Sequence, residues 1–166
     1  MNTLKHILPT ALLLLSLAAV ATAGTPNERL SASPAAAHQD GESLRVRLSF
    51  DGGEAIVQLD DHPASRDFYA MLPLRLTLED YNKTEKIGYL PKKLQTKGSP
   101  SSCDPAAGTF AYYAPWGNLA IFYRDFRHSE GLVPLGRIIS GMQHLAGIPD
   151  DVPVQMEPIP RQGEGQ

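Results

Sequence analysis

The stretch Leu44-Arg45-Val46-Arg47-Leu48-Ser49-Phe50 alternates strictly between apolar and polar residues. A period of two is typical of a β-strand with one buried face. Asp51-Gly52-Gly53 follows, and glycine tolerates the positive φ of a tight turn. Ala55-Ile56-Val57-Gln58-Leu59 then returns as a second strand. Together these segments predict a β-hairpin.

A short amphipathic helix is expected directly after this hairpin. Asp60 or Asp61 can cap its start, and Pro63 suits its first turn. The apolar stripe of the helix consists of Ala64, Phe68, Met71 and Leu72. Spacings of four, three and one place these side chains on one face over roughly ten residues. Pro73 then ends the helix.

Short strands account for most of the remaining chain, between turns rich in Gly and Pro. They are expected at 74–78, 85–90, 109–114, 118–123, 132–139 and 152–157. The last contains Pro153 and is expected at a sheet edge, where a proline does least harm. A long loop is expected over 91–108 and a short helical turn over 141–145. This pattern predicts a mainly β protein, a closed or nearly closed β-barrel with one main capping helix and a short helical turn.

The first 23 residues have the three parts of a cleavable signal peptide. Lys5 lies in a basic start, an apolar run of about 14 residues covers 7–20, and small residues precede Gly24. The run is shorter than the roughly 20 residues that span a bilayer. We therefore expect cleavage between Ala23 and Gly24, and an exported protein, periplasmic or secreted, with no membrane contact afterwards.

Cleavage of 23 residues from a chain of 166 leaves 143, a normal size for one domain with a core. Residues 24–42 are small and polar and predict a disordered linker, and 161–166 a disordered tail. The domain is therefore expected over 43–160, as a monomer. The net charge is −3 and no Lys/Arg-rich run follows the signal, which argues against nucleic acid as a partner.

Common catalytic and metal-binding patterns are missing from the sequence. Cys103 is the single cysteine and is interpreted as a loop thiol. The histidines after residue 23 are scattered, without a spacing of four residues or a cysteine partner. His128 and Glu130 could place two ligands on one side of a strand, but solvent-facing residues are the better interpretation. We expect neither a metal nor a cofactor.

Seven of the twelve aromatic residues fall between Phe110 and Phe126. Rigid amphipathic rings suit a recognition surface, although barrel core is the ordinary interpretation. Alternation places Tyr113 on one face of its strand and Phe110 on the other. The residues that could line a ligand site are Tyr113, Trp116, Asn118 and Tyr123.

Four segments resemble known proteins. The hairpin followed by residues 61–72 is similar to the opening of cyclophilins. Residues 87–91, 108–123 and 131–137 resemble a small prokaryotic cyclophilin-like family, with Pro-Trp-Gly-Asn at 115–118 and Leu-Val-Pro-Leu-Gly at 132–136 as the specific parts. The resemblance spans 43–159 and implies a compact β-barrel capped by a helix. The resemblance implies no established activity.

The segments that contain the catalytic residues of prolyl isomerases in the cyclophilin family are absent from this sequence. In cyclophilins that are prolyl isomerases, a Phe-His-Arg segment follows the helix. Residues 74–78 of this chain instead read Leu-Arg-Leu-Thr-Leu, and the Phe-Met-x-Gln segment of those enzymes occurs nowhere in the sequence. Arg66 or Arg75 could replace the missing arginine. The rotation barrier of about 18–20 kcal/mol needs groups placed for the twisted amide. We expect a non-catalytic domain that binds a small molecule or peptide through an aromatic surface. A divergent peptidyl-prolyl isomerase and an accessory protein–protein interaction module are the alternatives.

The expected cleavage point can be tested by changing one side chain at a time. Signal peptidase accepts only small residues at the last position before the cut. Ala23→Leu should therefore abolish processing, whereas Thr22→Leu, one position earlier, should leave it intact. N-terminal sequencing of the exported protein should begin at Gly24. Export of an uncut chain, or an equal effect of both substitutions, would contradict this expectation.

Overall fold

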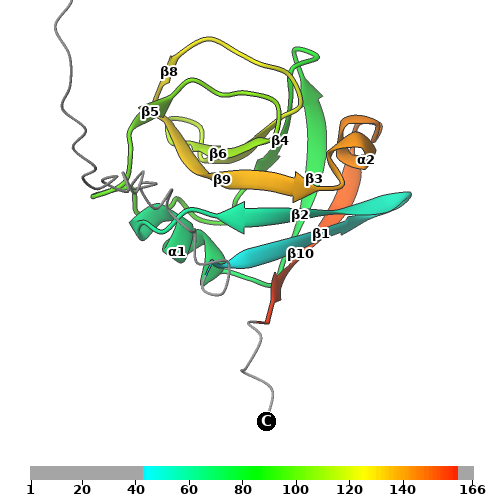
Figure 1. Cartoon of the computed structure of the whole chain (residues 1–166), viewed down its shortest axis with the longest axis horizontal. Coiled ribbons are helices and arrows are strands. Elements are labelled where there is room, and N and C mark those ends of the chain that lie inside the picture. Colours follow the sequence, from blue (N-terminus) through cyan, green and yellow to red (C-terminus); the bar gives the residue numbers. More distant parts are fainter. Residues whose placement is uncertain (1–42, 161–166) are drawn as a thin grey trace, which may run out of the picture. The chain divides into compact units, whose positions relative to one another are not determined.

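The computed structural model describes residues 43–160, and the expected signal peptide, linker and tail lie outside them. Within these residues, eight antiparallel strands close into a barrel (Figure 1). In pairing order they are β1 (Arg45–Phe50), β10 (Val152–Ile159), β3 (Leu74–Tyr81), β4 (Glu85–Tyr89), β7 (Asn118–Phe122), β6 (Thr109–Tyr113), β9 (Leu132–Ser140) and β2 (Gly53–Leu59). The main helix is α1 (Pro63–Tyr69), and α2 (Met142–Ala146) is a short helical turn. The prediction of a mainly β, closed barrel is confirmed.

The opening hairpin has the expected register. Val46 of β1 lies opposite Val57 of β2, and Leu48 lies opposite Ala55. All four side chains are fully buried in the barrel core. Gly52 adopts a φ of 90° in the connecting turn, which glycine reaches without steric cost. The alternation in the sequence therefore fixes which face of the hairpin points inward.

The cap of α1 differs from the prediction. His62, and not Asp60 or Asp61, is the N-cap, and its Nδ1 accepts a hydrogen bond from the amide of Ser65 at 3.4 Å. The His62 Nε2 atom donates to the carbonyl oxygen of Pro134 at 2.7 Å. The imidazole thus joins the helix start to β9, a link that no local capping rule contains. The helix also ends at Tyr69, before Met71 and Leu72.

The expectation that the last strand is an edge strand is wrong. β10 pairs with β1 on one side and with β3 on the other, because closure of the barrel leaves it no free edge. Pro153 lies near the start of β10, opposite Thr77. A missing amide donor interrupts the pairing least at a strand end.

A two-stranded ribbon lies outside the barrel, where the sequence suggested only loops. β5 (Ser102–Cys103) pairs with β8 (Ser129–Glu130). Figure 1 shows both at the top of the view, on the side opposite β1 and β10. Each strand has only two residues, too few for a periodic pattern to be visible in the sequence.

A buried polar network lies next to the barrel core at β4. Lys86 is 3% exposed, and its Nζ donates to the carbonyl oxygen of Ile148 at 2.7 Å and lies 3.1 Å from Asp80 Oδ2. Tyr123 Oη donates to the same Asp80 oxygen at 2.6 Å. Burial alone raises the pKa of Asp80, but the hydrogen bonds from Tyr123, Lys86 and the Lys83 amide together lower it. Burial and the bond to Asp80 raise the pKa of Tyr123 to about 12.

Close packing of β9 on β2 predicts the effect of a single methyl group at Gly136. A Cβ there would lie 2.2 Å from the carbonyl oxygen of Gln58 and 2.8 Å from Leu59 Cα. Gly136→Ala should therefore lower the free energy of unfolding by about 2 kcal/mol or more, because backbone atoms must separate. At Gly147 a Cβ would meet nothing nearer than 3.6 Å, so Gly147→Ala is the matched control. Equal urea-unfolding curves for the two variants would contradict the close approach.

Candidate functional site

The outer face of β4, β7 and β6 presents one set of alternating side chains. Glu85 of β4 lies opposite Phe122 of β7, and Asn118 of β7 lies opposite Tyr113 of β6. Neighbouring residues such as Leu119 point the other way, into the barrel core. The pairing register therefore gathers Glu85, Phe122, Asn118 and Tyr113 on the same side of the sheet.

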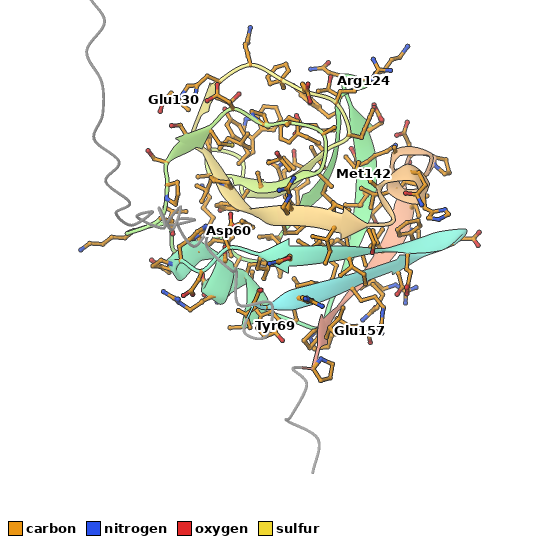
Figure 2. The ribbon with its side chains drawn as sticks, in the orientation of Figure 1. Asp60, Tyr69, Arg124, Glu130, Met142 and Glu157 are labelled. Atoms are coloured by element: carbon orange, nitrogen blue, oxygen red, sulfur yellow. The ribbon has the colours of Figure 1, made fainter. Side chains whose placement is uncertain are left out.

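A cleft of about 410 Å³ lies over this face. Tyr81 and Trp116 border it, together with the segment from Phe126 to Glu130. The Phe126 amide donates to the carbonyl oxygen of Pro105 at 2.8 Å, which ties that segment to the long loop before β6. In Figure 2 Glu130 marks the β8 end of the segment, on the side of the barrel away from Tyr69 and Glu157.

Trp116 is at the centre of an aromatic group in the cleft. Its ring meets Tyr81 edge-on at 5.6 Å between centroids and Tyr113 at 5.4 Å. The Gly117 amide donates to the Tyr113 carbonyl oxygen at 2.8 Å and closes the turn that holds Trp116 outward. The Trp116 side chain is 48% exposed. T-shaped pairs hold such rings in fixed orientations.

Two acceptor groups in the cleft have no partner among residues 43–160. The carboxyl group of Glu85 forms no hydrogen bond or ion pair there, and Asn118 Oδ1 is buried without a donor. Asn118 is 1% exposed, and its amide nitrogen donates to the carbonyl oxygen of Leu119 at 2.9 Å. Burial raises the pKa of Glu85 to about 7. Both groups would gain from a hydrogen-bond donor in the cleft.

The positively charged side chains at the rim already have partners. The Arg127 guanidinium lies over the Phe126 ring, 5.4 Å from its centroid. His128 lies between Asp104, at 3.1 Å, and Glu130, at 3.3 Å. These two hydrogen bonds raise the pKa of His128. Among residues 43–160, no group of three or more His, Cys, Asp or Glu is placed to hold a metal ion.

Three of the four residues expected to line a ligand site lie in this cleft. They are Tyr113, Trp116 and Asn118. Tyr123 is not in the cleft lining, because it follows the end of β7 and is bonded to Asp80. Sequence reasoning missed Glu85 and Tyr81. Their positions depend on the pairing of β3 with β4 and of β4 with β7, which a single strand pattern does not reveal.

Cys103 borders a second hollow of about 320 Å³, which Asp104 and Arg137 also line. Burial, with a contribution from the Asp104 charge, raises the pKa of the thiol to about 11. The nucleophilic form of cysteine is the thiolate, so this thiol is poorly suited to attack at neutral pH. Its position gives no support for a catalytic cysteine.

Comparison with known proteins places the chain in a family. Residues 48–157 match the model of the Cyclophilin-like family, and because this is more than half of the chain, the protein belongs to that family. The resemblance seen in the sequence is thereby confirmed. The solution structure of the hypothetical protein AF2241 from Archaeoglobus fulgidus is similar, with a TM-score of 0.53 and 23% identity. The alignment covers 72% of this chain and 98% of the archaeal chain, and at this identity it shows the fold alone. No curated protein sequence matches. No helix within residues 43–160 has the length and apolarity needed to cross a membrane.

The raised pKa of Glu85 predicts that the folded protein loses stability as pH rises. Its pKa is about 7 in the folded protein against a usual 4.5, so between these values the folded state holds a proton that the unfolded chain has released. The free energy of unfolding should therefore fall over this window, relative to Glu85→Gln, by on the order of 2 kcal/mol, less than the full conversion of the pKa shift because the carboxyl group is partly exposed and screened by solvent. Glu79→Gln, on an exposed residue of β3, is the control and should behave as wild type. Urea unfolding at about pH 4.5 and about pH 8 measures the difference. Parallel curves for wild type and Glu85→Gln would show that the carboxyl group is not desolvated.

Proposed function

We propose that this member of the cyclophilin-like family is an exported, non-catalytic binding protein that holds a small molecule or short peptide in the cleft. One observation carries the proposal: an aromatic-lined hollow contains a buried polar atom, Asn118 Oδ1, that the described residues leave without a partner. Folded proteins satisfy nearly all such atoms, so an unpaired one in a cleft points to a ligand that completes it.

The dimensions and lining of the cleft support a small ligand. Its volume of about 410 Å³ falls within the roughly 300–1,000 Å³ of typical small-molecule sites. Trp116 and Phe126 are 48% and 43% exposed, and burying their faces would give hydrophobic stabilisation to a complex. The polar groups between them would then set the orientation of the ligand.

The chemistry of the cleft favours binding over prolyl isomerisation. Stabilising a twisted prolyl amide requires preorganised donors aimed at the reacting group. The unpaired groups in the cleft are the Glu85 carboxyl group and Asn118 Oδ1. Asn118 Oδ1 accepts hydrogen bonds, and so does Glu85 when it is charged. Arg66 and Arg75 are exposed residues outside the cleft lining, and Arg127 lies over Phe126.

Ligand binding can be measured through the single tryptophan, which lies in the cleft. A library of small molecules and short peptides should contain members that change Trp116 fluorescence and shift the amide signals of β4, β6 and β7. Trp116→Ala should weaken their binding about tenfold or more, because it removes the central ring. Ile139→Ala removes a side chain that is 45% exposed elsewhere on β9, and should leave binding unchanged. A library without any cleft binder, or equal effects of both variants, would overturn the proposal.

The absence of catalysis is tested with a proline-containing peptide. The rate of cis–trans exchange should equal the uncatalysed rate at every protein concentration. An acceleration that Trp116→Ala or Arg127→Ala removes would overturn the non-catalytic part of the proposal.

A further inference from the structure

We propose that the ligand of this cleft carries an organic cation, an ammonium or guanidinium group attached to an apolar body, and that Glu85 is the counter-charge that selects it. The inference rests on the proposed function and adds the chemical class of the ligand. It is drawn from the position of Glu85 and from the partners of every charged group around it.

The Glu85 carboxyl group lies between two aromatic residues. Tyr81 of β3 is its direct partner on one side, and Phe122 of β7 is its direct partner on the other. Side chains directly opposite each other in antiparallel strands have Cβ atoms about 4.5–5.5 Å apart. All three residues line the cleft. The half-buried carboxyl group is therefore flanked by an aromatic side chain on each side.

A partly buried carboxylate without a partner is costly for the folded state. The raised pKa of Glu85, about 7, reflects this cost, since burial is its cause. A cation that entered the cleft would provide the missing charge and remove the cost. Strongly perturbed groups in clefts are frequent at functional sites for this reason.

No cation of the protein fills this role among the described residues. Lys86 follows Glu85 in the chain but lies on the inner face of β4, bonded to Asp80 and Ile148. Across the cleft, Arg127 lies over Phe126 and His128 lies between two carboxylates. From β3 and the following turn, the cleft receives only the neutral residues Tyr81, Asn82 and Thr84. Glu130, from β8, also lines the cleft, and its Oε1 atom lies 3.3 Å from His128 Nε2.

The rest of the cleft suits the body of such a ligand. The faces of Tyr81 and Trp116 can attract a cation through their π-electrons. Asn118 Oδ1 is a second acceptor, and it lies four residues along β7 from Phe122. Four residues of strand are roughly 13 Å at the backbone. In the proposed complex the aryl or alkyl body of the ligand lies between the two acceptors, against Trp116.

The test compares three probes with the same aryl body: 2-phenylethylamine, 2-phenylethanol and phenylacetate. An alkylammonium group titrates near pH 10, so the amine is charged throughout the useful range. At about pH 8, titrations followed by Trp116 fluorescence and amide shifts should give the amine about tenfold higher affinity than the alcohol. Phenylacetate should bind most weakly of the three.

Substitution of Glu85 separates charge recognition from binding to the aromatic surface. In Glu85→Gln the amine should lose its advantage and bind within about twofold of the alcohol, while the affinity for the alcohol stays as in wild type. Glu79→Gln removes an exposed acidic side chain outside the cleft lining and should keep the preference. Circular dichroism of each variant checks that the barrel is folded.

The affinity of the wild type for the amine should also rise with pH through about 7, as Glu85 becomes charged. The hydrogen bonds to Asp104 and Glu130 raise the pKa of His128, so the charge of this second group also depends on pH, and His128→Gln is measured alongside. The rise should persist in His128→Gln and vanish in Glu85→Gln. A rise that vanishes only in His128→Gln would overturn the role of Glu85.

Failure of this inference differs from failure of the proposed function. Equal affinities for amine and alcohol, or tightest binding of phenylacetate, would overturn the cation preference while the cleft remains a binding site. If none of the three probes shifts a cleft amide but other library members do, the cation class is also wrong. If nothing in the library or the panel binds, both proposals fall.

Discussion

The pairing register of β4 with β7 and of β7 with β6 is the constraint on which the rest of the structure depends. Because the barrel is closed, alternate side chains of these strands either fill the interior or lie on the outer face. Leu119 and Ile121 fill the interior, whereas Ala120 and Phe122 belong to a smaller apolar cluster outside it. A slip of one residue would exchange the two sets, and neither the core nor the cleft would form.

The same constraint gives two neighbouring charged residues opposite surroundings. Lys86 points inward and is bonded to Asp80 and to a backbone carbonyl, so its burial is compensated. Glu85 points outward into an aromatic cleft and has no partner among the described residues. The first pair of interactions stabilises the fold. The surroundings of Glu85 disfavour its charged form in the unliganded protein. In the proposed complex, a bound cation would stabilise that charged form.

Local patterns predicted much of the fold and part of the site. The period of two predicted the opening hairpin, and the aromatic segment after Gly108 singled out Tyr113 and Trp116, which the structure places in the cleft lining. The errors arose where distant pairing decides the outcome. His62 caps α1 because the carbonyl of Pro134 holds its ring, and Glu85 enters the cleft because β3 and β7 flank it. Neither contact has a signature within a few residues of sequence.

The central claim is that Glu85 is a desolvated carboxyl group without a partner in a cleft ready for a cation. The most direct measurement is the pH titration of its side-chain carboxyl carbon by NMR, in the unliganded protein. We expect a midpoint at about pH 7. A midpoint at its usual value of 4.5 would show a solvated or paired carboxylate and would contradict the account.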